Sequence, residues 1–326
     1  LALHQGRRIA SRSRASVIRD AEPIAAGPGA SPASRASGPT STAQAKAPRW
    51  AGSISDVGGP SANMWRARCV LPEGKTCRRA SCMHPSVCHF FAVNQREGVA
   101  LLRSISALPG IRHVRVASGV RFDLALKDDE ALFAYTSEFT GGQLKVAPEH
   151  VDDAVLELMR KPSLAVFEQF LQRFAASCRS SDKELYTVPY LMSAFPGCTE
   201  EHMRVLSRWL RSRNWSPQQV QCFIPTPGTV ATAMFFAGID PDGNPLHVAR
   251  SDAERLRQHH MLFHQRPGTN PRHGKDSRHT PPGRRQDGRS TAKPERRGKS
   301  ETAKPHGGND IENKRQANYS KKRKKP

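Results

Sequence analysis

From residue 52 to residue 265, short apolar runs alternate with amphipathic segments, and this strand-then-helix order constrains the fold more than any other feature of the sequence. The run IRHVRVAS (111–118) alternates apolar and polar residues, as a half-buried strand does, whereas apolar residues in 94–108 recur at helical spacing. Repeated units of this kind place parallel strands side by side, joined by helical crossovers. The pattern therefore predicts an α/β domain over 52–249, followed by a C-terminal helix in 250–265.

Five candidate strands follow from this pattern, and helices are expected between them. The strands are predicted at 53–57, 112–117, 143–147, 185–192 and 219–224. The helices are predicted at 94–108, 128–138, 151–160, 163–178, 199–213, 229–237 and 251–264. Five parallel strands favour an incomplete β/α barrel, and an open doubly wound sheet is the alternative.

The segments outside this pattern have compositions that oppose a hydrophobic core. Residues 1–22 are expected to hold one short helix that begins after Ser16. Residues 23–51 are rich in Pro, Ala, Gly, Ser and Thr, and residues 266–326 are rich in Arg, Lys, Pro and Gly. Because such segments bury too little apolar surface to offset their ordering entropy, we predict a disordered insertion and a disordered basic tail.

The net charge of +22 resides mostly in these flanking segments, since residues 49–265 carry only +4 of it. The central part has no motif of a sequence-specific nucleic-acid reader. The charge therefore predicts at most weak, salt-dependent contact of nucleic acid with the tail, which is one alternative function for the chain. No apolar run approaches the about 20 residues of a membrane span, and no secretion signal is present, so we expect a cytoplasmic protein without membrane contact.

Four of the seven cysteines are crowded into the polar segment 66–90, with the spacing C-x7-C-x4-C-x5-C. They are Cys69, Cys77, Cys82 and Cys88. Arginine and lysine residues surround them and favour the thiolates that bind metals. Four thiolates suit zinc or an iron–sulfur cluster, with His84 and His89 as possible substitute ligands. The alternative is a set of reduced cysteines buried as small apolar side chains.

Glycine, proline and polar residues follow each predicted strand, at the end where α/β proteins hold their ligands. The residues that point to a shared ligand site are Gly58, Gly59, Ser118, Arg121, Lys145, Glu149 and His150. Glycines allow a close backbone approach to a ligand, and the charged residues suit a charged one. Ordinary turn chemistry is the alternative for any single strand end.

Several long motifs together resemble the YgiQ-like radical SAM proteins of bacteria. They are HQGRRIASRSRASVIRDAE, ISDVGGPSANMW, CRRASCMHPSVC, ASGVRFD, LKVAPEH with MRKP, VPYLMSAFPGCTEEHM and VQCFIPTPGTVATAMFFAG. The resemblance covers about residues 3–22 and 52–264. It implies a partial β/α barrel in which a 4Fe–4S cluster binds S-adenosylmethionine (SAM) and cleaves it reductively to a radical that attacks an unknown substrate. A flavodoxin or ferredoxin would supply the electron.

The chain departs from this family at the cluster loop. The family holds its cluster on a C-x3-C-x2-C loop, and that pattern does not occur in this sequence. We therefore expect a chain truncated at its N-terminus, with the cluster cysteines upstream of Leu1, the first barrel strand missing, and residues 1–22 as the remnant of the first barrel unit. A metal-stapled α/β domain without activity is a further alternative.

The resemblance also implies roles for individual residues. Gly58 and Gly59 occupy the place where the family contacts the amino group of SAM, and Ser118 and Arg121 join them as cofactor-binding candidates. Lys145, Glu149 and His150 become barrel-mouth candidates for SAM or substrate. The four clustered cysteines match a cysteine-rich insertion in the family, which suggests an auxiliary iron–sulfur cluster or zinc.

Overall fold

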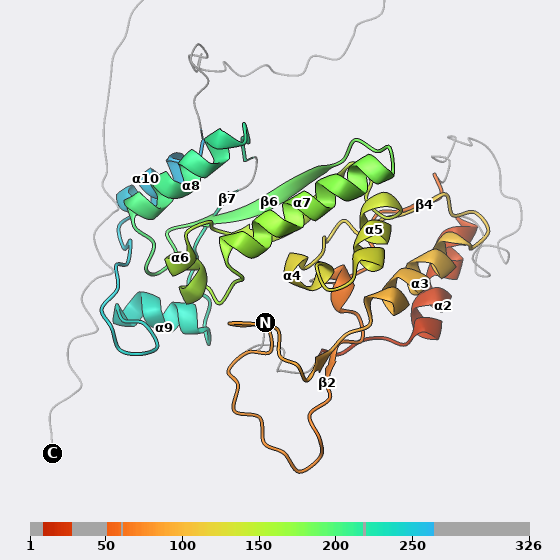
Figure 1. Ribbon diagram of the computed structural model, residues 1–326, viewed down its shortest axis with the longest axis horizontal. Coiled ribbons are helices and arrows are strands. Elements are labelled where there is room, and N and C mark those ends of the chain that lie inside the picture. The colour runs from red at the N-terminus through yellow and green to blue at the C-terminus, as the bar shows by residue number, and fades with distance from the viewer. Residues whose placement is uncertain (1–8, 28–50, 60, 218–219, 264–326) are drawn as a thin grey trace, which may run out of the picture. The chain divides into compact units, whose positions relative to one another are not determined.

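A computed structural model describes residues 9–27, 51–59, 61–217 and 220–263 (Figure 1). Each predicted strand range contains a strand of the structure, although β1, β4 and β7 are shorter than predicted, and the five strands pair as two parallel sheets. In one sheet β1 (Ser53–Ile54) pairs with β4 (His113–Val114). In the other, the order is β5 (Gln143–Glu149), β6 (Tyr186–Ser193) and β7 (Val220–Cys222). A short antiparallel pair that the sequence did not predict joins β2 (Arg68–Cys69) to β3 (Phe91–Ala92).

The α/β class is confirmed, but the described strands form no closed barrel and no single doubly wound sheet. The gap lies between β4 and β5, where the backbone N–H of Val120 donates to the carbonyl of Lys145 at 3.4 Å. Gly119 has φ +82°, which lies outside the extended region that a strand needs. The chain after β4 therefore turns away from regular pairing with β5, although the two segments remain in contact.

The predicted helices are confirmed with small shifts at their ends. They are α3 (Gln95–Ser106), α5 (Asp129–Ser137), α6 (Asp153–Leu158), α7 (Leu164–Ser180), α8 (Glu200–Ser212), α9 (Val230–Ala237) and α10 (Asp252–His260), and a short α4 (Phe122–Ala125) adds to them. Polar caps set their starts: Asp128 accepts from the N–H of Ala131 at 3.1 Å, and Thr199 forms a capping box with His202.

The first helix, α2 (Arg14–Ala26), is longer than predicted. Ser13 caps it, where Ser16 was expected, and the helix continues through Pro23. Ala25 is buried, so the predicted disordered insertion is wrong for residues 23–26. The rest of that insertion that falls in 28–50, and the predicted tail at 266–326, lie outside the described residues.

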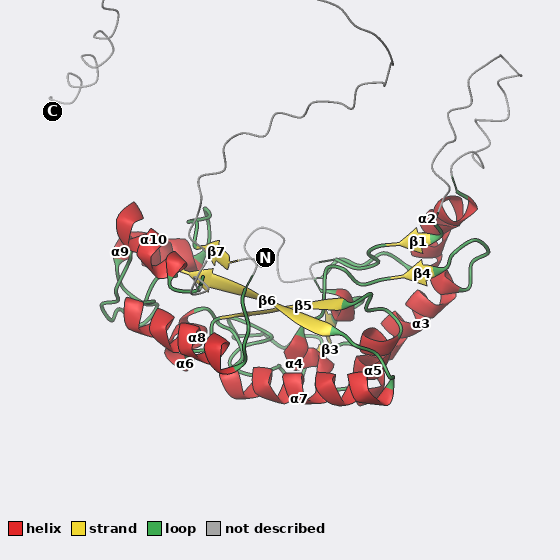
Figure 2. Ribbon diagram, turned by 90° about the horizontal axis from the view of Figure 1, so that it is seen from above, coloured by secondary structure: helices red, strands yellow, loops and turns green. Residues whose placement is uncertain are grey.

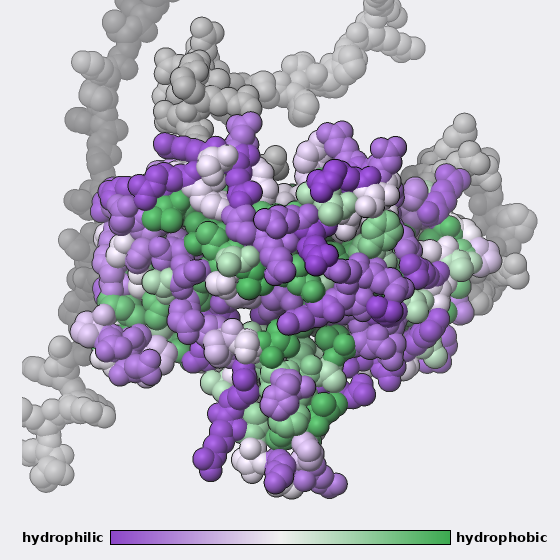
Figure 3. All heavy atoms as spheres, in the orientation of Figure 1, coloured by the Kyte–Doolittle hydropathy of each residue, from purple (hydrophilic) through white to green (hydrophobic). Residues whose placement is uncertain are grey.

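Two hydrophobic clusters lie under the strands, and Figure 2 shows the helices α4 to α8 on one side of β5 and β6. The first cluster combines α3, α5 and α7 with residues next to β1, β4 and β5. The second combines α6 and α8 with the C-terminal ends of β6 and β7. The face drawn in Figure 3 is mostly hydrophilic with green areas between, as expected for a surface over a covered core. No helix among the described residues is long and apolar enough to cross a membrane.

Candidate functional site at the strand ends

The end of β1 and the end of β4 meet at a carboxylate. Asp56 Oδ1 accepts hydrogen bonds from the backbone N–H of Ser118 at 3.0 Å and from the Ser118 hydroxyl at 3.1 Å. Gly58 lies directly beside them, since a Cβ at this position would come within 2.7 Å of Ser118 Oγ. Gly59 has open space around it instead. The structure thus brings Gly58 and Ser118 together and adds Asp56 to them.

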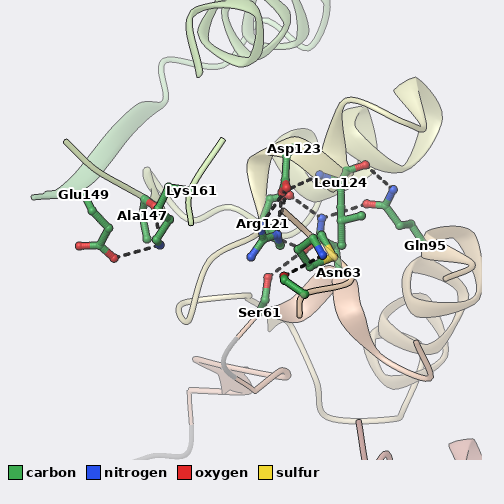
Figure 4. Close-up of polar contacts among 11 residues, drawn as sticks. Ser61, Asn63, Gln95, Arg121, Asp123, Leu124, Ala147, Glu149 and Lys161 are labelled. Carbon is green, nitrogen blue, oxygen red and sulfur yellow. Dashed lines mark hydrogen bonds and ion pairs between the residues drawn. The ribbon is translucent and has the colours of Figure 1, made fainter. Parts of the chain in front are cut away.

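A buried polar network around Asn63 follows this meeting point along the chain (Figure 4). Asn63, in the short 3-10 helix η2 (Ala62–Met64), is 1% exposed. Its amide group donates to Gln95 Oε1 at 3.0 Å and to the carbonyl of Arg121 at 2.9 Å, and its oxygen accepts from the N–H of Arg121 at 2.8 Å. Gln95 in turn donates to the carbonyl of Leu124 at 2.7 Å. Asn63 therefore fixes the backbone on both sides of Arg121, as a fully paired buried amide does.

The side chain of Arg121 is held by the neighbouring Asp123. The guanidinium lies 2.8 Å from Asp123 Oδ1, and it also donates to Asp123 Oδ2 at 2.9 Å. Asp123 is nearly buried, while about a quarter of the Arg121 side chain is exposed. Such a paired guanidinium has a fixed position and still offers donors to an anionic ligand.

The loop after β4 lies against the middle of β5 without room for a side chain. A Cβ on Gly119 would come within 2.2 Å of the carbonyl oxygen of Lys145. The carbonyl of Gly119 accepts from the N–H of Ala62 at 3.0 Å, which connects the loop to η2. The backbone of Lys145 therefore joins the site, and its side chain is half-buried.

At the end of β5, Glu149 adopts a left-handed backbone conformation with φ +68°. Lys161 Nζ lies 3.1 Å from Glu149 Oε1 and donates to the carbonyl of Ala147 at 3.1 Å, so it holds both the strand end and the carboxylate (Figure 4). A non-glycine residue at such a φ costs free energy that the surroundings must offset, and strained positions of this kind concentrate at functional sites. Lys161 and Asp123 both line one pocket of about 470 Å³, so one member of each ion pair borders the same pocket.

His150 lies apart from the other predicted site residues, because it is fully buried next to Cys198. Its Nδ1 accepts from the N–H of Asp152 at 2.9 Å, and its Nε2 lies 3.8 Å from Cys198 Sγ. Burial lowers the pKa of His150 to about 4 and raises the pKa of the Cys198 thiol to about 12. The imidazole is therefore neutral, with its hydrogen on Nε2, and belongs to the packing around α6 and α8.

The buried state of His150 predicts a pH dependence of stability. In the unfolded chain an ordinary histidine takes up a proton below pH 6.5, whereas the folded protein resists it until about pH 4. Neutral His150 thus contributes to the free energy of unfolding above pH 6.5. This contribution, about 3 kcal/mol, is lost as the pH falls toward 4. Urea unfolding of His150→Gln should show a flatter pH profile across this window than the wild type.

The exposed His113 supplies the control for this experiment. His113→Gln should keep the slope of the wild type between pH 6.5 and pH 4. If the stability of the wild type and of His150→Gln changed equally with pH, the folded chain would protonate His150 at the same pH as the unfolded chain. The pKa of about 4 assigned to folded His150 would then be wrong.

The four clustered cysteines lie in the loop that begins at β2 and returns at β3 (Figure 1). All four are free thiols, with Cys69 and Cys77 exposed, Cys82 half-buried and Cys88 buried. His84 of the same loop pairs with Glu157 of α6 at 2.9 Å, so the loop is anchored beside the pocket that Asp123 and Lys161 line. Among the described residues, no three side chains of His, Cys, Asp or Glu are placed to hold a metal ion.

Several site residues were missed by the sequence analysis, and some had usable signals. Gln95, Val99 and Leu102 stand at helical spacing, and all three are buried, so Gln95 is a polar residue on the core face of α3. Asn63 and Lys161 each lie inside a motif that the resemblance used, but single residues there carry no distinctive pattern. Their partners are 32 and 12 positions away in sequence, and only the fold brings them together.

Comparison with known proteins finds relatives over most of the chain. The chain is 41% identical over 265 residues to a UPF0313 protein of Geobacter sulfurreducens. It is 37% identical over 266 residues to one of Methanosarcina mazei and 36% identical over 255 residues to one of Rhodopseudomonas palustris. These alignments cover 80%, 81% and 78% of this chain but 40%, 39% and 35% of the relatives. No family model matches the chain.

The chain thus spans about two fifths or less of the length of these curated relatives. Identities of this size over hundreds of residues indicate common ancestry. These identities support the family that the motifs suggest, and the names of these relatives assign no activity. Over about four fifths of its length, this chain is therefore a homologue of part of the UPF0313 proteins.

Proposed function

We propose that this chain is part of a YgiQ-like radical SAM protein and that its strand ends bind SAM. The arrangement of Asp56, Gly58 and Ser118 carries this proposal. SAM presents an ammonium group, a carboxylate and two ribose hydroxyls to a protein. Asp56 can accept from an ammonium or hydroxyl group, and Gly58 lets the backbone come close to the ligand.

Charged groups at other strand ends suit the remaining parts of such a ligand. Arg121 is fixed by Asp123 and still partly exposed, which suits a carboxylate. Glu149, held by Lys161, suits hydroxyl groups of a ribose or a substrate. Gly59 and Lys145 remain candidates next to these residues, whereas the buried His150 does not reach such a ligand.

A 4Fe–4S cluster would supply the electron that cleaves SAM, but the described residues do not fit its ligands. The sequence has no C-x3-C-x2-C pattern, and no described group of side chains is placed to hold a metal. In this proposal the chain's own residues bind and orient SAM, while cluster ligands and an electron donor such as a flavodoxin or ferredoxin come from outside this sequence. A barrel-like arrangement of the strands is part of the same proposal.

The substitution Gly58→Ala tests the site directly. The added Cβ would lie 2.7 Å from Ser118 Oγ, so the hydroxyl that donates to Asp56 Oδ1 must move. We expect SAM to bind at least about tenfold more weakly than to the wild type, a loss of about 1.4 kcal/mol. Isothermal titration calorimetry with SAM measures the affinity.

Gly243→Ala is the control for this comparison, since a Cβ there meets nothing within 4 Å and the residue lies in a surface turn. Its SAM affinity should stay within about twofold of the wild type. No detectable binding of SAM to the wild type at millimolar concentration would end the proposal, as would equal affinities of the wild type and Gly58→Ala.

A further inference from the structure

The loop that carries the clustered cysteines is closed at its base by β2 and β3. Cys69 stands opposite Phe91 in this antiparallel pair, and the N–H of Val70 donates to the carbonyl of Phe90 at 2.8 Å. The N–H of Phe91 donates to the carbonyl of Cys88 at 2.9 Å. The pairing therefore brings the first and the last of the four cysteines to the same end of the loop.

A second set of contacts folds the loop back around Cys82. The N–H of Cys88 donates to the carbonyl of Cys82 at 2.8 Å. The guanidinium of Arg79 donates to the carbonyls of Ser81, His84 and Ser86, which wraps the chain on both sides of Cys82. Backbone contacts thus connect Cys82 to Cys88 and place Cys88 near Cys69 at the base of the loop, while Cys77 lies between Cys69 and Cys82 in the sequence.

The loop has little else to hold it in shape. Regular structure is confined to the two-residue strands β2 and β3, and most of its side chains between them are exposed or half-buried. Ordering each residue costs about 1–2 kcal/mol of backbone entropy, which a loop without a core does not recover from apolar burial. Small segments of this kind commonly draw their folding free energy from a structural metal.

We propose that Cys69, Cys77, Cys82 and Cys88 together bind one metal centre through four thiolates, either a zinc ion or an iron–sulfur cluster. The exposed Cys69 and Cys77 must close on Cys82 and Cys88 for this, because the thiols as described are not yet placed as a metal site. Arg68, Lys75, Arg78 and Arg79 lie in the same loop and offset the negative charge of four thiolates. The buried-cysteine alternative is wrong for Cys69 and Cys77, since both are exposed.

Metal analysis of the purified full chain tests this proposal. The protein is prepared anaerobically from medium supplemented with zinc and iron, and its metal content is measured by mass spectrometry. We expect about one zinc per chain, or about four irons with a visible brown absorbance for a cluster. Cys77→Ser and Cys82→Ser should lower that content at least tenfold. Cys77 is exposed, so its replacement should leave the helical circular dichroism unchanged.

Cys222→Ser is the matched control, since Cys222 lies in β7, outside the loop. It should keep the metal content of the wild type. Metal below about a tenth of an ion per chain in the wild type would overturn the proposal, and so would unchanged content in Cys77→Ser or disulfides among the four cysteines in peptide maps. The metal measurement requires no SAM. A negative result would therefore contradict the metal centre without contradicting the SAM site, and absence of SAM binding would not contradict the metal centre.

Discussion

Replacing Gly119 by alanine is expected to destabilise the protein by about 2–5 kcal/mol. A left-handed φ costs a residue with a side chain about 1–2 kcal/mol, and Gly119 has φ +82°. In addition, the new Cβ would overlap the carbonyl oxygen of Lys145 at 2.2 Å, so backbone must move on one side. Overpacking of this kind costs about 1–3 kcal/mol. Urea unfolding followed by circular dichroism measures the change.

Gly74→Ala separates the steric contribution from the conformational one. Gly74 has φ +76°, and a Cβ there meets nothing within 4 Å. This variant should therefore lose only about 1–2 kcal/mol. If Gly119→Ala and Gly74→Ala lowered the free energy of unfolding equally, the described close contact between Gly119 and Lys145 of β5 would be contradicted. Because the carbonyl of Gly119 also accepts from Ala62, we expect Gly119→Ala to weaken SAM binding as well.

The substitution Asn63→Asp should cost about 3–5 kcal/mol at neutral pH. The Asn63 amide donates to Gln95 Oε1 and to the carbonyl of Arg121 in a fully buried place. A carboxylate there would face two acceptors and bury an unpaired charge, which carries a cost of this size. The deficit relative to the wild type should shrink as the pH falls below the raised folded-state pKa of the new carboxyl group, because a protonated carboxyl group regains one donor.

The direction of this pH dependence of stability follows from the linkage between protonation and folding. Burial beside acceptors raises the pKa of the introduced carboxyl group in the folded state above its unfolded value, so the folded protein binds the proton more tightly. The variant is then least destabilised below the unfolded pKa and most destabilised above the folded one. Asn94→Asp is the control: Asn94 is an exposed cap of α3, where aspartate caps equally well, so the change should stay within about 0.5 kcal/mol. A pH-independent deficit in Asn63→Asp would contradict the assigned contacts of Asn63.

The sequence predicted the elements better than their pairing. Apolar periodicity located α3 and α7 within two residues, since those helices bury one regular face. The sheet boundary between β4 and β5 was missed, because the left-handed turn at Gly119 depends on contact with Lys145, which follows 26 positions later. The composition of residues 23–51 misled the prediction in another way: it indicated disorder from residue 23 onward, yet α2 continues through Pro23 and buries Ala25.

In the candidate site, too, the sequence predicted positions along the chain better than contacts in space. Gly58, Ser118 and Arg121 were predicted from their places after strands; in the structure Gly58 lies beside Ser118, and the backbone of Arg121 contacts Asn63. His150 was predicted from the same rule, but its side chain lies on the buried side of the chain. Strand ends indicate where a ligand site is expected in an α/β protein, whereas the direction of each side chain depends on local backbone angles such as the φ of +68° at Glu149.

The two hydrophobic clusters share two side chains, Leu164 and Trp209, each of which packs against both. Disruption of one cluster therefore removes contacts from the other, which favours a single cooperative unfolding transition. A ligand bound near β1 and β4 would then stabilise α8 and β7 as well, by mass action on the whole unit. Occupancy of the strand ends and protection of the distant C-terminal helices would rise together, without any contact between them.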